Sequence, residues 1–119
     1  MKHILVVDDD SSILSVTSRA LAGYRVSIAR DPDEALAAAN QAASLDLLIT
    51  DFLMPSMTGD ELVARMREQR PSLKVLVLTG HGNILERENP AGWNSAAHLS
   101  KPVDIDILRA TVAGLIGPP

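Results

Sequence analysis

The chain has 119 residues, 46% hydrophobic and 22% charged, which is the size and composition of one globular domain. Its net charge of −4, its 3% of aromatic residues and its lack of cysteine exclude a strongly basic nucleic-acid-binding surface, an aromatic base-stacking platform, disulfides and thiol catalysis. The apolar run after Lys2 meets Asp8 too soon for a secretory signal, and no stretch approaches the roughly 20 apolar residues of a membrane span. We therefore expect a single domain over residues 1–119, located in the cytoplasm, that contacts neither nucleic acid nor membrane directly.

The chain begins with a strand pattern followed by a helix pattern. Residues 3–7 (HILVV) form a continuous apolar run, typical of a strand that is buried on both faces. Ser11 or Ser12 can cap the helix that follows, Asp10 is expected to be a cap or a charge at the rim, and Gly23 ends the helix. The apolar residues at helical spacing predict the stripe that faces the core: Ile13, Val16, Ala20 and Leu21.

The next segments repeat this order. Residues 24–29 favour a second strand. Asp31, followed by proline and then by Glu34, predicts a capped helix that continues through an alanine-rich stretch to about residue 43. Residues 45–50 predict a third strand, so strands and helices alternate from the start of the chain.

The second half continues the alternation with one interruption. Thr58 begins a capping box, and the helix after it ends before Pro71, with three side chains expected to face the core: Leu62, Val63 and Met66. Residues 74–78 and 96–100 predict the fourth and fifth strands. Between them, glycine and proline break residues 80–95, so we expect a short or irregular fourth helix and a mobile loop there.

The last helix completes the pattern. Asp104 caps it, and its apolar stripe is predicted to consist of Ile105, Leu108, Val112 and Leu115. Alternating strands and helices predict an α/β fold with a parallel sheet covered by helices on both faces. Five strands fit the flavodoxin-like, doubly wound order 2-1-3-4-5, in which the functional crevice lies beyond the carboxyl ends of the central strands.

Polar side chains stand where four of the predicted strands end. They comprise three carboxylates, a hydroxyl and an ammonium group, namely Asp8, Asp9, Asp51, Thr79 and Lys101. Because the carboxyl ends of parallel strands share one edge of the sheet, we expect these groups to converge there.

Three close carboxylates repel one another unless one is protonated or a cation is present. Oxygen ligands without histidine or cysteine favour a hard ion, Mg²⁺ rather than zinc. Mg²⁺ also binds phosphate oxygens, a lysine adds a second positive charge, and an aspartate can accept a phosphoryl group. The set therefore predicts phosphoryl transfer onto an aspartate, assisted by positioning and charge neutralisation.

The motifs themselves resemble a known family. The sequence contains VVDD ending at Asp9, D-x-x-M-P starting at Asp51, Gly59, LTG around Thr79, and a Lys-Pro pair at Lys101. The intervals of 43, 28 and 22 residues between Asp8, Asp51, Thr79 and Lys101 also match. Together these motifs resemble the receiver domains of two-component response regulators, over essentially the whole chain.

The resemblance implies a role for each acidic position. Asp51 would accept a phosphoryl group from the phosphohistidine of a sensor histidine kinase or a phosphotransfer protein. Asp9 would bind Mg²⁺ directly, Asp8 would bind it through water, and the backbone carbonyl of Leu53 would complete the protein ligands. The domain would catalyse its own phosphorylation and dephosphorylation, with no separate substrate, and would change the face it offers to an output partner whose identity the sequence does not encode.

The resemblance also implies a switch. The Thr79 hydroxyl would hydrogen-bond the phosphoryl group, Lys101 would pair with a phosphoryl oxygen, and the Lys101–Pro102 peptide would be cis. Movement of Thr79 would open a space for the ring three residues before the lysine. That residue is His98, where the family usually has tyrosine or phenylalanine, so we expect a wetter or pH-sensitive switch.

Two further departures concern hydrolysis of the phosphorylated state. Leu53 stands where relatives often carry a polar side chain, and His81 stands at another variable position. An apolar Leu53 is expected to order the attacking water poorly, which predicts a long-lived phosphoryl group. Equally fast loss of radiolabel from the parent and from Leu53→Asn would contradict this.

Two other readings of the sequence remain open. Asp8-x-Asp10 resembles the nucleophile and acid pair of haloacid-dehalogenase-like phosphatases, with Asp104-x-Asp106 as a late acidic motif. That reading gives Asp51 no role. The chain could also be a pseudo-receiver, a constitutive binding module without phosphoryl chemistry.

Overall fold

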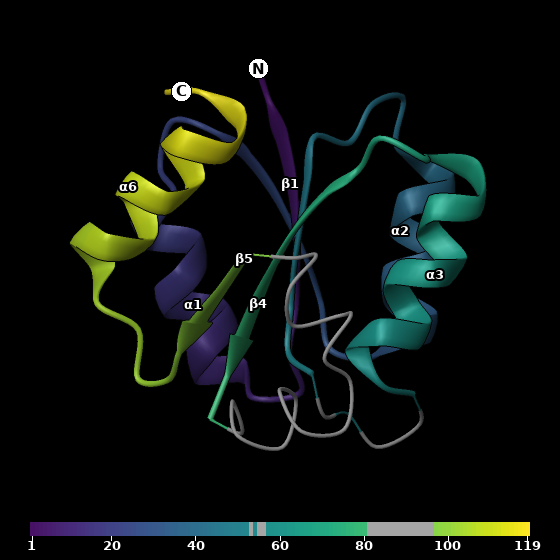
Figure 1. Cartoon of the computed structure of the whole chain (residues 1–119), viewed down its shortest axis with the longest axis horizontal. Helices are drawn as coiled ribbons and strands as arrows, with labels where there is room; N and C mark the ends of the chain where they lie inside the picture. Colours follow the sequence, from purple (N-terminus) through teal and green to yellow (C-terminus); the bar gives the residue numbers. More distant parts are fainter. Residues whose placement is uncertain (53, 55–56, 81–96) are drawn as a thin grey trace.

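The computed structural model describes residues 1–52, 54, 57–80 and 97–119 (Figure 1). Within them, one parallel sheet has the strand order β2-β1-β3-β4-β5. The strands are β1 (His3–Val7), β2 (Arg25–Ala29), β3 (Leu47–Thr50), β4 (Lys74–Thr79) and β5 (Ala97–Ser100). This order confirms the predicted topology.

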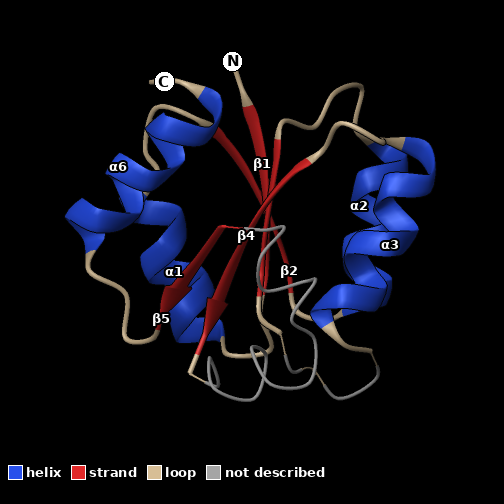
Figure 2. Ribbon diagram, in the orientation of Figure 1, coloured by secondary structure: helices blue, strands red, loops and turns tan. Residues whose placement is uncertain are grey.

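Helices cover both faces of the sheet (Figure 2). One layer is formed by α1 (Ser11–Ala20) and α6 (Ile105–Ile116), and the other by α2 (Pro32–Gln41) and α3 (Gly59–Gln69). The fold is therefore the doubly wound, flavodoxin-like α/β fold that the sequence predicts. The fourth helix was expected in residues 80–95, and residues 81–95 of that range lie outside the described part of the chain.

The apolar strands supply a separate core to each helical layer. In β1, Ile4 and Val6 pack in the cluster beneath α1 and α6, whereas Leu5 and Val7 pack in the cluster beneath α2 and α3. All four side chains are no more than 1% exposed. A strand covered on both faces gains from apolar side chains at every position, which explains the unbroken run in the sequence.

Side-chain caps begin the four helices that the structure describes. The Asp31 carboxylate, the Thr58 hydroxyl and the Asp104 carboxylate each accept a hydrogen bond from a backbone amide in the first turn. The cap of α1 is Asp10, not Ser11 or Ser12. Asp10 Oδ1 accepts from Ser12 N at 2.9 Å and from Ser12 Oγ at 2.6 Å, so it satisfies an amide that Ser11, already inside the helix, cannot reach.

The apolar stripes of two helices differ from the prediction. In α1, Leu14 and Thr17 face the core together with Ala20, whereas Val16 is 43% exposed. In α6, Leu108 and Val112 are buried as predicted, but Ile105 is 47% exposed. Short helices with apolar residues on two adjoining faces allow two stripes, and the neighbouring layer decides which one is buried.

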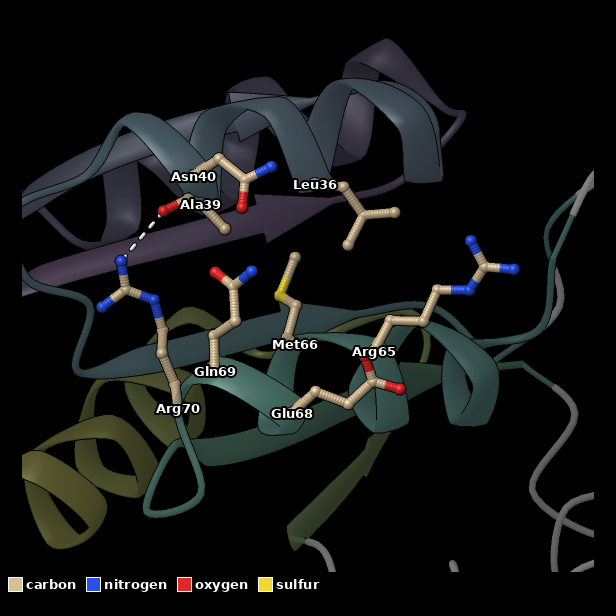
Figure 3. A pocket seen from close by; sticks show the side chains of 8 residues that line it. All are labelled: Leu36, Ala39, Asn40, Arg65, Met66, Glu68, Gln69 and Arg70. Atoms are coloured by element: carbon tan, nitrogen blue, oxygen red, sulfur yellow. Dashed lines mark hydrogen bonds between the residues drawn. The ribbon is translucent and has the colours of Figure 1, made fainter.

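Two helices on the same face are tied at their ends. Arg70, which follows α3, donates from Nη2 to Ala39 O at the end of α2 at 2.9 Å (Figure 3). The same nitrogen donates to Ala42 O, also at 2.9 Å. Carbonyls at the carboxyl end of a helix lack most of their intrahelical donors, and Ala39 O receives only a long bond of 3.3 Å from the Ala42 amide, so the guanidinium group adds a donor to both. The bonds fix the separation of α2 and α3 on this face.

Both chain ends lie at the amino edge of the sheet (Figure 1). There Tyr24 Oη donates to Gly117 O at 2.7 Å, and Lys2 Nζ donates to Pro118 O at 3.2 Å. The buried His3 ring contacts Ser44 O at 2.8 Å and a serine hydroxyl of β2 at 2.7 Å. None of the helices described is long and apolar enough to cross a membrane.

Candidate functional site

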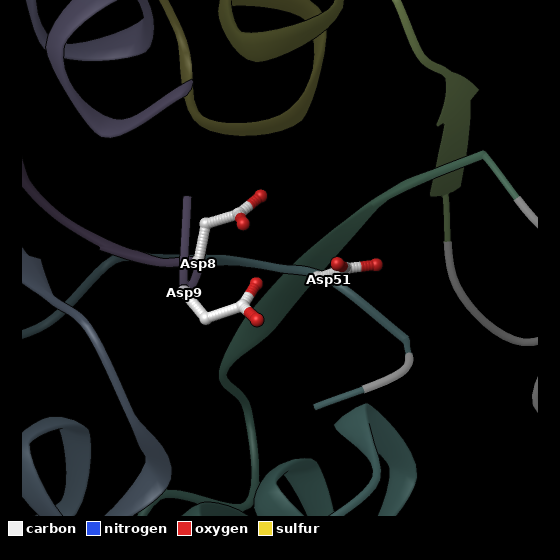
Figure 4. A group of neighbouring side chains, drawn as sticks. All are labelled: Asp8, Asp9 and Asp51. Carbon is white, nitrogen blue, oxygen red and sulfur yellow. The ribbon is translucent and has the colours of Figure 1, made fainter. Parts of the chain in front are cut away.

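Three aspartates meet at the opposite, carboxyl edge of the sheet (Figure 4). Asp8 and Asp9 follow β1, and Asp51 follows β3, which is hydrogen-bonded to β1. One carboxylate oxygen from each of the three lies within 4.8 Å of the others. Asp8 and Asp51 are 2% and 8% exposed, whereas Asp9 is exposed to solvent. The Asp51 amide donates to Val7 O at 3.2 Å, which extends the pairing of the two strands up to the acids.

Lys101 joins two of these acids. Its Nζ lies 2.7 Å from Asp8 Oδ2 and 3.1 Å from Asp51 Oδ2. Burial lowers the pKa of Lys101, but the hydrogen bonds to Asp8 and Asp51 and their negative charges more than offset it, so the pKa is raised above its usual range. Lys101 therefore stays an ammonium group and neutralises part of the acidic cluster. The peptide between Lys101 and Pro102 is cis, as the resemblance implied.

One acidic oxygen has no protein partner. Asp51 Oδ1 is the buried side-chain polar atom without a hydrogen bond among the residues described. A buried carboxylate oxygen is costly when it is unsatisfied, so it calls for a donor or a cation. Three carboxylates also exceed the single ammonium group that faces them. This all-oxygen donor set, with one oxygen unsatisfied, fits a hard divalent cation.

Thr79 and His98 lie on the neighbouring strands. Thr79 ends β4, is 1% exposed, and accepts a backbone hydrogen bond from Lys101 N at 3.0 Å. Thr79 pairs with Ser100, the last residue of β5, and therefore lies at the carboxyl edge of the sheet, where the acids meet. His98 pairs with Val77 in the edge strand β5 and has an exposed side chain.

The remaining sequence-derived candidates do not join this cluster in the described structure. Asp10 is exposed, and its carboxylate is engaged by Ser12. Asp104 caps α6. Asp10, the carboxylate that the phosphatase reading pairs with Asp8, is therefore occupied in a helix cap. Leu53 and His81 lie outside the described residues, so their predicted roles remain predictions.

Two residues beside Asp51 were not recognised as site residues. The Thr50 hydroxyl donates to Asp51 O at 3.0 Å, and Thr50 is 1% exposed. Gly59, which the sequence offers only as a motif residue, packs directly against the Asp51 and Phe52 backbone. A polar residue ending an otherwise apolar strand is the sequence signal for the first. For Gly59, the sequence shows that a glycine is present but does not show that it contacts the Asp51 backbone.

The comparison with known proteins identifies the domain. The family model for the response regulator receiver domain matches residues 4–113. The chain belongs to this family. The receiver domain is 35% identical over 112 residues to the transcriptional regulatory protein GlrR of Escherichia coli strain K12, covering 92% of this chain and 25% of that protein.

Solved structures agree with this assignment. Chemotaxis protein CheY4 of Vibrio cholerae has a TM-score of 0.85 at 34% identity, covering 97% of this receiver domain and 98% of that chain. Response regulator TrrA of Thermotoga maritima, whose structure holds Mg²⁺ and BeF, has a TM-score of 0.83 at 30% identity, covering 97% and 99%. The chain spans about a quarter of the length of GlrR, so what it matches there is one domain of a longer protein. Receiver domains are parts of two-component systems and not a conventional enzyme family.

Proposed function

We propose that this receiver domain is a phosphorelay switch in which Asp51 accepts a phosphoryl group from the phosphohistidine of a sensor kinase or a phosphotransfer protein. The observation that carries the proposal is the convergence of Asp51 with two further carboxylates and the Lys101 ammonium group at one edge of the sheet. This complete set favours phosphoryl chemistry over a pseudo-receiver, because a binding module has no use for buried, mutually repelling acids.

We further propose that the acids hold Mg²⁺. Asp9 and Asp51 would bind it directly, Asp8 would bind it through water, and the Leu53 carbonyl would add a backbone oxygen. The unsatisfied Asp51 Oδ1 supports this assignment, as does the Mg²⁺ in the structure of TrrA. When bound, the ion neutralises charge on the carboxylates and on the phosphoryl oxygens.

The transfer itself needs little covalent chemistry from the protein. An oxygen of the Asp51 carboxylate attacks phosphorus, the bond from phosphorus to the donor imidazole nitrogen breaks, and that nitrogen keeps the electron pair and is protonated by solvent. Lys101, already 3.1 Å from Asp51, pairs with a phosphoryl oxygen, and the Thr79 hydroxyl donates to another. Water later attacks the acyl phosphate and restores the Asp51 carboxylate.

Phosphorylation then changes the partner-binding face. The proposed sequence is that Thr79 turns toward the phosphoryl group and that His98, exposed on β5 in this structure, moves into the space released. We also propose that residues 1–119 act as one receiver domain and that it works in the cytoplasm. Its output partner or attached effector is not specified by these residues.

The test is Mg²⁺-dependent labelling with radiolabelled acetyl phosphate. The parent protein is expected to take up label, and chelation of the metal is expected to prevent it. Asp51→Asn should abolish labelling because the amide is not a nucleophile. Asp33→Asn is the matched control, since Asp33 is exposed in the first turn of α2 and should leave labelling unchanged. A label that persists in Asp51→Asn, or a parent that stays unlabelled, would refute the proposal.

A further inference from the structure

We propose that Gly59 is a positioning residue for the phosphoacceptor. Because Gly59 has no β-carbon, the first turn of α3 can lie against the backbone of Asp51 and Phe52, and this contact holds the Asp51 carboxylate in its direction toward Asp8 and Lys101. The inference rests on the proposed role of Asp51 and concerns how this chain sets the geometry of that role.

The contact is too close for any other residue. A β-carbon on Gly59 would lie 2.5 Å from Asp51 O and 3.1 Å from Phe52 Cα, whereas ordinary contacts begin at 3.4 Å. Both neighbours are backbone atoms, so no side-chain rotation can make room. The Gly59 amide also donates to Phe52 O at 2.7 Å, which draws the helix start and the end of β3 together.

Space, rather than backbone conformation, demands the glycine. The glycines with positive φ in the described residues are Gly23 and Gly117, and Gly59 is not among them. Alanine could therefore adopt the backbone conformation of Gly59, and it is a better helix former. An alanine at this position is disfavoured for one reason, the collision of its methyl group with the Asp51 and Phe52 backbone.

The Asp51 peptide is held from several directions at this point. Its amide donates to Val7 O at 3.2 Å, and its carbonyl accepts from the Thr50 hydroxyl at 3.0 Å. Gly59 lies against the same carbonyl oxygen. Small movements of this peptide pass directly to the carboxylate, because the side chain has two torsions between backbone and oxygen.

The helix cannot simply move away to admit a methyl group. Leu62 is fully buried and Met66 is 3% exposed, so α3 is packed firmly on the sheet. At its other end, Arg70 donates to Ala39 O of α2 (Figure 3) and to Ala42 O. An added β-carbon would have to lie roughly 0.9 Å farther from Asp51 O to reach an ordinary contact distance. Because α3 is held, part of this movement would have to come from the Asp51 peptide. Misplacement of a reacting group by about 1 Å can cost on the order of 10²-fold in rate.

The experiment compares Gly59→Ala with two controls. In Gly114→Ala the new methyl group meets no atom within 4 Å, so it controls for glycine replacement in a helix. Val112→Ala, in the core beneath α6 on the other face of the sheet, controls for loss of stability. With Mg²⁺ and acetyl phosphate, Gly59→Ala should be labelled about 10- to 100-fold more slowly than the parent. Both controls should be labelled at the parent rate while folded.

A second readout needs neither metal nor phosphodonor. The carbon-13 chemical shift of the Asp51 carboxyl group in the metal-free protein should move in Gly59→Ala and stay at the parent value in both controls. A folded Gly59→Ala with the parent labelling rate and the parent Asp51 chemical shift would overturn the inference, even if its melting temperature falls.

Two contingencies keep the test decisive. If Gly59→Ala does not fold, Thr50→Val takes its place, because it removes the hydroxyl that holds the same carbonyl while preserving shape. An unchanged labelling rate and Asp51 chemical shift in Thr50→Val would then count against the inference. If the parent itself takes up no label, the proposed function fails, and the chemical shift of Asp51 still decides whether Gly59 sets its position.

Discussion

At the scale of single residues, the site has three carboxylates and one lysine that contacts two of them. Asp8 and Asp51 are nearly buried, and Lys101 contacts both, but Asp9 brings a third carboxylate to within 4.8 Å of them. Buried charges of one sign are costly unless they are paired. The arrangement therefore depends on Lys101 in the free protein and has room for a further cation.

Lys101→Met should destabilise the metal-free protein by about 3 kcal/mol, because it leaves two buried carboxylates without their ammonium partner. This value is at the lower end of the cost of breaking a buried ion pair, because the Lys101 side chain is 20% exposed. Saturating Mg²⁺ should restore part of the loss, as a ligand of the folded state does. Urea unfolding with and without Mg²⁺ measures both effects. The control is Lys74→Met at the exposed start of β4, and an equal loss there would contradict the expectation.

Asp10 makes the stability of the folded protein depend on pH in the acidic range. Hydrogen bonds from the Ser12 hydroxyl and from the Ser12 amide lower the pKa of Asp10 below its ordinary 3.8. Its stabilising contribution is thus present above pH 3.8 and is lost as the pH falls through the lower pKa of the folded state. The difference in melting temperature between the parent and Asp10→Asn should shrink over that range. Ser12→Ala, which removes the main cause of the shift, should reduce the pH dependence, and a difference that is constant with pH would refute this account.

At the scale of elements, each helix buries one stripe of side chains, and its packing on the sheet and beside the neighbouring helix determines which stripe is buried. In α1 the buried side chains are Leu14, Thr17 and Ala20, although Val16 is also one helical turn from Ala20. A short helix with apolar residues on two faces has no unique inward direction until its neighbours are fixed. Here α6 packs beside α1 on the sheet and fixes its rotation.

This rotation predicts opposite outcomes for neighbouring residues. Leu14→Ala should lower the free energy of unfolding by about 2–5 kcal/mol, because Leu14 is 2% exposed in the core. Val16→Ala should change it by no more than about 0.5 kcal/mol, since Val16 is 43% exposed. Chemical denaturation of the two variants measures the difference. A larger loss in Val16→Ala than in Leu14→Ala would show that the other stripe faces the core.

At the scale of the whole molecule, the two edges of the sheet have different tasks. The carboxyl edge gathers the acids and Lys101, whereas the amino edge joins the two chain ends through Tyr24, Gly117 and Lys2. Tyr24 and Gly117 are 93 positions apart in the sequence, so their bond closes the fold on the side away from the site. The bonds that join the chain ends therefore lie away from the acids and Lys101.

Tyr24→Phe tests this separation. Loss of the hydroxyl leaves Gly117 O without its donor and should cost about 0.5–1.5 kcal/mol of stability, measured by urea unfolding. The rate of labelling by acetyl phosphate should equal that of the parent, since the substitution lies at the opposite edge. A slower rate in folded Tyr24→Phe would show that the two edges are coupled.

The 2-1-3-4-5 order is one that five such strands fit, and the strand pairings of the structure establish it. Periodicity and caps in the sequence determine the alternation of strands and helices and the meeting of strand ends. These features follow from local physics: a buried strand needs an unbroken apolar run, a helix start needs a side-chain acceptor, and parallel strands end at one edge. Asp8, Asp51 and Lys101 could be selected for the same reason, since each stands at the end of a predicted strand.

Tertiary structure decides what local pattern leaves open. Val16 and Ile105 face solvent, and Gly59 fits against the Asp51 backbone. Each of these depends on where a second element lies, to within a few tenths of an ångström at Gly59. Sequence spacing fixes which residues share an edge or a helix, but the packing of layers fixes which surface is buried and how closely two backbones approach.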